Sequence, residues 1–301
     1  MRVHHFNTGT MCPASARLVN GRGRLFGPAR MICHVLLIET ERDGLILVDT
    51  GLGTGDIADP ARLGRWWVRM VRPRLDPDET ALAHVRALGH SPDDVRHIAL
   101  THLDLDHAGG VPDFPRAAVH VHRREHAAAM ARAGKRERRR YIPGHWRHEP
   151  SWQLHDDGGD EWFGFSGVRA LVREPDILLV PLPGHTAGHS GIAVRDGERW
   201  LLHAGDAYFF HRQIETPPAA PMVLRVFQRG SDTDRAQRMA NQERLRRLAA
   251  EHGREVVIFN AHDAVDFDRL VAAAASGAAA AAAAPAGAGA NTTYTGVSQS
   301  V

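Results

Sequence analysis

The sequence predicts an α+β protein of four layers, in which two β-sheets pack face to face between outer helices. Strand-like apolar runs fall into two separate stretches, one before residue 122 and one after residue 177. In both stretches several of these runs end in His or Asp. Segments typical of helices, at residues 125–140 and 233–252, separate or follow the strands. We therefore expect an αβ/βα sandwich in which the polar ends of the strands meet at one edge of the two sheets.

The length and the composition favour one large domain. The chain has 301 residues, of which 43% are hydrophobic, so a sizeable core can form, and we place the domain at residues 1–270. Residues 271–301 consist mostly of Ala, Gly, Ser and Thr and have no apolar face that could pack. We expect this tail to be disordered, with at most a frayed helical start.

Charge and cysteine content restrict the partners and the compartment. A formal net charge of +2 gives no reason to expect nucleic acid, so a small molecule is the expected substrate. No N-terminal segment is typical of a signal peptide and no apolar run is long enough to span a membrane. Cys12 and Cys33 are too few for a disulfide framework, and we expect buried thiols in a cytoplasmic protein. The oligomeric state stays open, and a homodimer is compatible with the sequence.

The first half contains a predicted hairpin and a helical stretch. Residues 32–39 and 44–49 are strand-like, and Asp43-Gly44 between them is typical of a tight turn. A helical stretch follows the Gly-rich residues after 51 and contains Trp66 and Trp67, which cannot both face one core. We expect one of these rings to pack and the other to line a cleft or an interface.

The stretch at residues 101–110 concentrates four potential metal ligands. His102, Asp104, Asp106 and His107 follow the strand predicted at residues 95–100. A regular strand would place His107 on the opposite side from the other three, so the chain must leave the strand for all four to converge. Gly109 and Gly110 permit this turn and a close approach of the next segment.

Residues 123–165 separate the two groups of strand-like runs. Within this range, residues 135–140 form a charge run that favours a solvated helix face over an anion-binding patch. Residues 141–152 break all periodicity and hold Tyr141, Trp146 and Trp152. They are compatible with a cleft wall and equally with an ordinary loop anchored by its aromatic side chains.

Three further short motifs lie in the second half, each at the end of an apolar run. They are residues 183–190 with His185 and His189, residues 202–206 with Asp206, and residues 259–263 with His262. The last follows the strand predicted at residues 255–260.

Together with residues 46–51, which end a strand at Asp49, these motifs resemble the signature of the metallo-β-lactamase superfamily over residues 30 to 265. The resemblance implies the four-layer sandwich of that family, a binuclear metal centre and a substrate-covering insertion at about residues 123–165. It assigns His102, Asp104 and His185 to one metal, Asp106, His107 and His262 to the other, and Asp206 as the bridge. Asp49 would support the metal-binding loops, and His189 would not be a ligand.

The same resemblance implies a hydrolase of the lactonase-like branch. Two divalent ions, zinc foremost with iron or manganese as alternatives, would hold a bridging hydroxide that attacks a small ester, lactone or thioester. Asp106 or Asp206 would carry the proton, and Tyr208 is a candidate donor to the oxyanion.

Asp104 departs from the family pattern, which usually has His at that position. The added negative charge predicts a less electrophilic centre and a shift of preference toward iron or manganese. An iron-dependent oxidoreductase of the flavodiiron or sulfur-dioxygenase type is therefore an alternative, and a catalytically inactive binding protein on the same fold is another. A flavodiiron enzyme would need a flavodoxin module, which the residues after 270 do not resemble.

Overall fold

Strand β2 (Met31–Glu39) shows how the sequence builds two layers at once. Successive side chains of a strand point to opposite faces of its sheet. Leu36 and Ile38 accordingly pack between the two sheets, whereas Val35 and Leu37 pack beneath the outer helices. All four side chains are fully buried. Burial of each stabilises the fold by roughly 1.5–3 kcal/mol.

The computed structural model describes residues 1–172 and 176–283. Its first sheet has antiparallel pairing from β1 to β3 and parallel pairing from β3 to β6. The strands, in spatial order, are β1 (Arg2–Met11), β2, β3 (Leu45–Val48), β4 (Val95–Ala99), β5 (Ala118–His122) and β6 (Ser151–His155).

The second sheet is antiparallel except for one parallel pair, β11 with β12. Its strands, in spatial order, are β12 (Val256–Phe259), β11 (Arg199–His203), β10 (Ser190–Asp196), β9 (Ile177–Pro181), β8 (Phe165–Ala170) and β7 (Asp160–Trp162).

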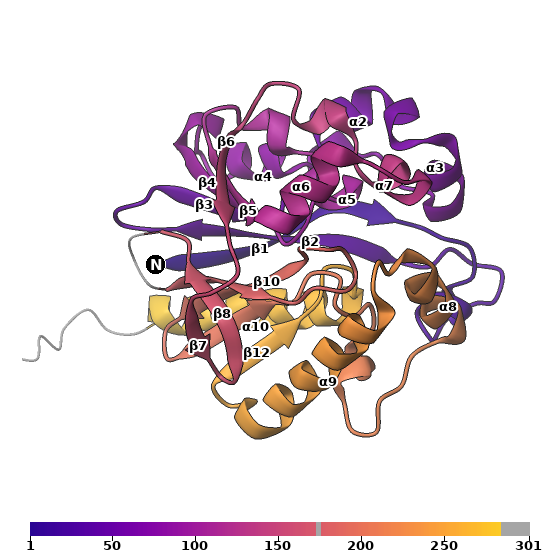
Figure 1. Ribbon diagram of the computed structural model, residues 1–301. Coiled ribbons are helices and arrows are strands. Elements are labelled where there is room, and N and C mark those ends of the chain that lie inside the picture. Colours follow the sequence, from indigo (N-terminus) through magenta and orange to yellow (C-terminus); the bar gives the residue numbers. More distant parts are fainter. Residues whose placement is uncertain (173–175, 284–301) are drawn as a thin grey trace, which may run out of the picture.

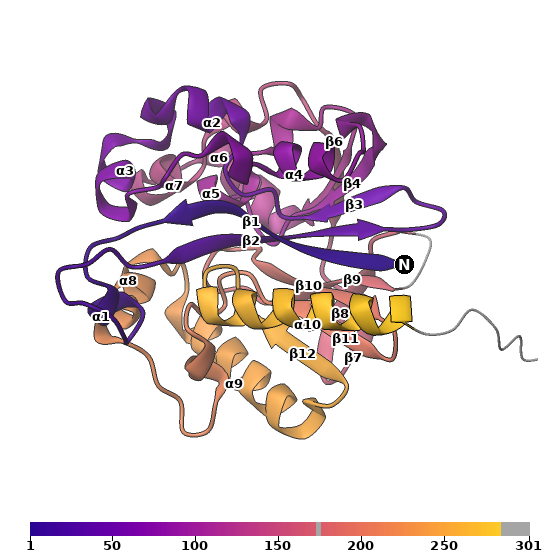
Figure 2. The same ribbon diagram turned by 180° about the vertical axis from the view of Figure 1, so that it is seen from behind.

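The helices before β6 are α1 (Ala16–Val19), α2 (Thr54–Ala58), α3 (Arg65–Val71), α4 (Ala81–Ala87), α5 (Leu105–Ala108), α6 (Arg123–Ala131) and α7 (Lys135–Arg140). Those after β11 are α8 (Met222–Ser231), α9 (Arg235–His252) and α10 (Ala264–Ala283). Helices α4 and α6 cover the outer face of the first sheet, and α9 covers that of the second (Figures 1 and 2). Helix α1 lies beside α8, and α10 lies against β1 and β2.

Three cores join the layers. Val85 of α4 and Ala129 of α6 pack on the first sheet, and Leu245 and Leu248 of α9 pack on the second. A middle core lies between the sheets. The predicted α+β sandwich of four layers is confirmed.

The predicted covering insertion and the predicted tail both contribute regular secondary structure. Residues 123–165 contribute β6 to the first sheet and β7 to the second, and within this range only residues of α7 line the cavity at the candidate site. Helix α10 takes in residues 271–283 of the predicted tail, and residues 284–301 lie outside the described part of the chain. The domain boundary at residue 270 therefore stays a prediction. In the described part of the chain, no helix combines the length and the apolar character needed to cross a bilayer.

Candidate metal centre

The four ligand candidates of the first half converge because the chain changes from strand to helix within them. Strand β4 ends at Ala99, the chain bends at Thr101, the backbone is extended at Asp104, and α5 begins at Leu105. The helical turn rotates Asp106 and His107 onto the side already occupied by His102. Gly109 then allows a close approach, because a Cβ there would lie only 2.6 Å from the carbonyl oxygen of Gly51.

Asp206 lies between two groups of ligand candidates. Its Oδ2 lies 3.3 Å from His185 Nε2 and 3.8 Å from His102 Nε2, whereas its Oδ1 lies 3.4 Å from His107 Nε2 and 3.1 Å from His262 Nε2. Each carboxylate oxygen thus faces a different pair of imidazoles, as a bridging carboxylate would.

Two further carboxylates complete the groups. Asp104 Oδ2 lies 3.1 Å from His185 Nε2 and 3.5 Å from His102 Nε2, and Asp106 Oδ2 lies 3.8 Å from His262 Nε2. The structure therefore brings together all seven side chains that the sequence assigned to metal binding. They are His102, Asp104, Asp106, His107, His185, Asp206 and His262.

Three of the imidazoles are oriented through their Nδ1 atoms. His107 Nδ1 lies 2.8 Å from Asp49 Oδ2, His262 Nδ1 lies 2.8 Å from the carbonyl oxygen of Ile32, and His102 Nδ1 lies 3.0 Å from Thr101 Oγ1. These contacts leave each Nε2 pointing to the centre, and partners of this kind fix the tautomer of metal-binding histidines. Asp49 has the supporting position predicted for it.

His189 supports the bridging residue through the backbone. Its Nε2 accepts a hydrogen bond from the Asp206 amide at 2.9 Å, and its Nδ1 lies 3.0 Å from the carbonyl oxygen of Leu182. Burial lowers the pKa of His189 well below its usual value, so the ring stays neutral and Nε2 stays an acceptor.

The chemistry of the donor set fits divalent cations. His102 Nε2, His107 Nε2 and Asp206 Oδ1 are buried and have no hydrogen-bond partner among the described residues. Buried polar atoms without partners are costly in a folded protein, and two bound cations would satisfy all three. Burial alone would raise the pKa of Asp206, but His262, His107 and His185 hold it well below its usual range. Imidazole nitrogen with carboxylate oxygen suits zinc, iron or manganese.

Arg140 is a functional candidate that has no signal in the local sequence. The last residue of the charge run at 135–140, it was expected on a solvated face, yet its side chain is only 10% exposed. Its Nε lies 3.4 Å from Asp104 Oδ1. The expectation is wrong for this residue because α7 packs against the site, where the guanidinium also donates to the carbonyl oxygens of His185 and Ser231.

An apolar cavity of about 630 Å³ opens onto the centre. Asp104, Asp106, His185, Asp206 and His262 line it on the metal side, and Arg136, Arg139 and Arg140 line it from α7. The rest of its wall is largely apolar and includes Trp66, Trp67, Met70, Phe209, Leu224 and Phe227. Both tryptophans thus line a cleft, and Trp67 also packs on neighbouring apolar residues.

The loop at residues 141–152 does not contribute to this cavity wall. Tyr141 is buried in the core between the first sheet and its outer helices, and Trp146 and Trp152 pack against that core. His145 Nε2 lies 2.9 Å from Asp56 Oδ1 beneath the loop. Of the two expectations, the anchored loop fits the structure.

Tyr208 is not brought to the centre. Its side chain is fully buried among the residues under α9, and it does not line the cavity, whereas the following residue, Phe209, does. Burial, together with Asp266 and Asp263, raises the pKa of its hydroxyl well above the usual value. We therefore assign no catalytic role to Tyr208.

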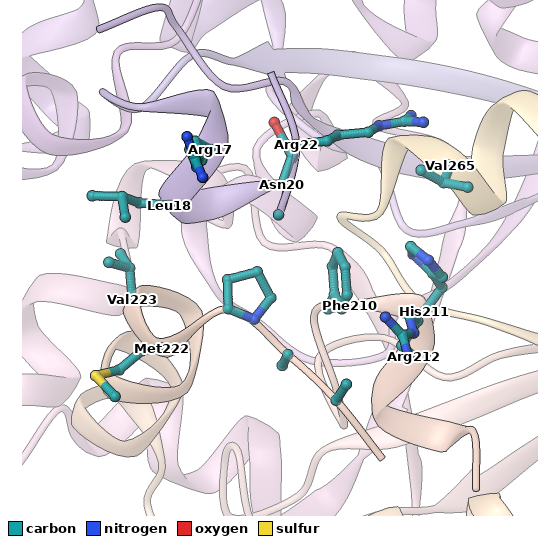
Figure 3. A pocket seen from close by; sticks show the side chains of 14 residues that line it. Arg17, Leu18, Asn20, Arg22, Phe210, His211, Arg212, Met222, Val223 and Val265 are labelled. Atoms are coloured by element: carbon teal, nitrogen blue, oxygen red, sulfur yellow. The ribbon is translucent and has the colours of Figure 1, made fainter. Parts of the chain in front are cut away.

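A free cysteine lies beside the candidate metal centre, and a second cavity lies apart from it. Cys33 is a free, buried thiol whose sulfur lies within 4.8 Å of ligand atoms of Asp106 and His262. A second cavity, of about 440 Å³, lies between α1 and the chain leading into α8 and is lined by Arg17, Phe210 and Met222 among others (Figure 3). It contains none of the predicted metal ligands.

The chain matches a known protein family and several known proteins. The family model of the metallo-beta-lactamase superfamily matches residues 29–262. The chain is 40% identical over 264 residues to the probable metallo-hydrolase Rv2300c of Mycobacterium tuberculosis, covering 87% of this chain and 80% of that protein. It is 31% identical to the N-acyl homoserine lactonase AttM of Rhizobium johnstonii, covering 56% of this chain and 63% of the lactonase.

Solved structures share the fold at lower identity. An N-acyl homoserine lactone hydrolase with the product N-hexanoyl-L-homoserine at its catalytic metal center has a TM-score of 0.67 at 20% identity, covering 89% of this chain and 95% of the other. The dizinc quorum-quenching lactonase AidC has a TM-score of 0.56 at 18% identity, covering 86% of each chain.

Proposed function

Because this chain belongs to the metallo-beta-lactamase superfamily, we propose that it is a metal-dependent hydrolase of a small lactone, ester or thioester. Relatives named as a metallo-hydrolase and as N-acyl homoserine lactonases support this class of reaction. The particular acyl substrate is left to experiment, since one fold hosts many chemistries.

The observation that carries the proposal is the position of Asp206. Its two oxygens face two separate pairs of imidazoles, at the bottom of an apolar cavity. This arrangement can hold two cations beside a site that accepts an apolar acyl group.

Each part of the site has a role in the proposed reaction. Bound divalent ions would polarise the substrate carbonyl and make a water molecule acidic enough to act as a nucleophile near neutral pH. Asp206, and Asp106 at the cavity wall, are the carboxylates that accept the proton and return it to the leaving group. Apolar side chains such as Phe209 and Leu224 exclude water and hold the acyl group beside the centre.

Two zinc ions are the cofactors that we propose. Iron or manganese is the alternative that Asp104 favours, because a carboxylate is a harder ligand than an imidazole. Metal analysis of protein purified without added metal, followed by reconstitution of the stripped protein with each ion, distinguishes them.

A substrate panel tests the proposed reaction. Lactones, thioesters, aryl esters and phosphodiesters are assayed with the protein reconstituted separately with zinc, iron and manganese. We expect turnover of acyl substrates above that of the phosphodiesters, and loss of turnover in Asp206→Ala. Preference for the phosphodiester would contradict the acyl assignment. Thiol-dependent oxygen consumption by the iron form, with no hydrolysis, would favour the oxidoreductase alternative.

A further inference from the structure

The three carboxylates of the candidate metal centre have different surroundings. Asp106 and Asp206 face imidazoles, whereas Asp104 also faces a guanidinium. Asp104 Oδ2 points to His185 and His102, and Asp104 Oδ1 points to Arg140 Nε at 3.4 Å. One oxygen is thus directed to the metal site and the other to the cation.

Arg140 is fixed in this position by contacts other than Asp104. It donates to the carbonyl oxygen of His185 at 3.2 Å and to that of Ser231 at 2.6 Å. These bonds hold the guanidinium between the loop that carries His185 and the end of α8. A buried charge that is held in place acts strongly on its neighbours, because little solvent screens it.

We infer that Arg140 is a positioning residue that cancels the charge of Asp104, so that the pair contributes to the centre as one electrically neutral ligand. This inference rests on the proposed metal centre and deepens it. Without Arg140, the three carboxylates would neutralise most of the charge of two divalent ions. With Arg140, the centre keeps one more unit of positive charge for polarising a substrate carbonyl.

If the two charges cancel, substitution of Arg140 and substitution of Asp104 should change zinc affinity in opposite directions. Arg140→Met removes a cation from the edge of the site, so zinc should bind at least about tenfold more tightly. Asp104→His removes an anionic ligand while the guanidinium stays, so zinc should bind at least about tenfold more weakly. The double variant should return to within about threefold of the wild type, and Arg140→Lys should stay closer to it than Arg140→Met because the positive charge is kept. Competition with a chromophoric chelator at fixed pH measures all four.

Arg136 provides the matched control. It lies on the same helix, lines the same cavity and donates to the carbonyl oxygen of Asp232, near the end of α8, but makes no ion pair with Asp104. Arg136→Met should leave zinc affinity within about threefold of the wild type. If Arg136→Met tightens zinc binding as much as Arg140→Met, a general cationic field would explain the result and the pairing would be overturned.

The metal-free protein gives a readout that does not depend on zinc. Each single variant leaves a buried charge without its partner and should lower the melting temperature. The double variant removes both charges and should melt higher than the sum of the two losses predicts. If a single variant fails to fold and the double variant folds, that result also shows the coupling, and Asp104→Asn then replaces Asp104→His in the zinc measurement.

Other outcomes would overturn the inference. A merely structural role for Arg140 predicts additive losses of melting temperature and zinc binding that weakens or stays unchanged in Arg140→Met. A direct role in substrate binding predicts a raised KM with unchanged zinc affinity in that variant. If the wild type binds no zinc, iron or manganese tightly, the proposed function itself fails, whereas the melting temperatures still test the pair.

Discussion

At the scale of the residue, the role of each aspartate depends on the groups that its carboxylate oxygens face. Asp49, Asp104 and Asp206 are all buried carboxylates of one site, yet the first faces the Nδ1 of an imidazole, the second a guanidinium and the third four imidazole Nε2 atoms. Their residue type is the same, and their expected effects on metal binding differ.

Asp49 should affect metal affinity without being a ligand. It holds the His107 ring through Nδ1 and accepts hydrogen bonds from the Thr101 amide and hydroxyl. Asp49→Asn should weaken metal binding by about 10–100-fold, the range found for partners that orient metal-binding histidines. Metal titration of the purified variant measures this, with the exposed Asp160→Asn as the control. Unchanged affinity in Asp49→Asn would mean that His107 does not need this partner.

At the scale of the element, α6 joins the two ligand loops. Glu125 in its first turn is fully buried and accepts hydrogen bonds from the Leu103 amide, the Gly188 amide and the Tyr141 hydroxyl. Leu103 follows His102, and Gly188 lies three residues after His185. One carboxylate of a helix therefore fixes both loops to the first sheet.

Removal of the Glu125 carboxylate should destabilise the fold. Glu125→Ala leaves three buried donors without an acceptor, each at a cost of about 1–3 kcal/mol. We expect a loss of several kcal/mol in the free energy of unfolding of the metal-free protein, measured by urea denaturation. Glu137→Ala, in the neighbouring helix α7, is the control and should change it little. Equal stabilities of the two variants would contradict this role of Glu125.

Helix α10 contains a carboxyl group that makes stability depend on pH. Burial, and then the charge of Asp263, raise the pKa of Asp266 from 3.8 to about 6. The folded state therefore binds this proton more tightly than the unfolded state does. The contribution to stability is complete below pH 4 and is lost as the pH rises from about 4 to about 6.

Asp266→Asn should remove this penalty. At pH 8 the variant should be more stable than the wild type by up to about 3 kcal/mol, and at pH 4 the two should be nearly equal. Thermal unfolding at both pH values measures the difference. A variant that is destabilised equally at both would show that the pair with Arg269 matters more than the buried charge.

At the scale of the whole molecule, metal binding should join the two halves of the sandwich. His102, Asp104, Asp106 and His107 follow a strand of the first sheet, whereas His185, Asp206 and His262 follow strands of the second. Zinc at a hundredfold excess over its Kd should stabilise the fold by about 2.7 kcal/mol per site. We expect a clear rise in melting temperature that chelation reverses and that His262→Ala reduces. A melting temperature that does not respond to zinc would contradict a centre shared by both halves.

The C-terminal residues from 275 onward should be dispensable. Leu270 of α10 belongs to the core between the sheets, so the helix is needed at least that far. Removal of residues from 275 onward should leave activity and melting temperature unchanged. Removal from residue 264 onward is the comparison and should destabilise the protein. A folded but inactive short truncation would show a role for residues after 275.

The order of the ligand motifs is what the sequence by itself determined. Each motif follows a short apolar run, and the two strand-rich halves predicted two sheets with their ligands at one edge. Strand alternation shows only that the chain must leave the strand for His102, Asp104, Asp106 and His107 to converge. The two strand-rich halves predicted the sandwich, and the resemblance to the metallo-β-lactamase superfamily implied the convergence of all seven ligand candidates.

Only the tertiary structure decided which distant groups surround these ligands. Arg140 lies in a charge run that is typical of solvent exposure, and Glu125 begins an ordinary helix, so neither has a local signal. Tyr208 was a candidate because the lactonase-like branch has a Tyr near this position after Asp206, yet its ring lies in the core under α9. The energy of a buried charge depends on neighbours contributed by other elements, and sequence periodicity does not contain those neighbours.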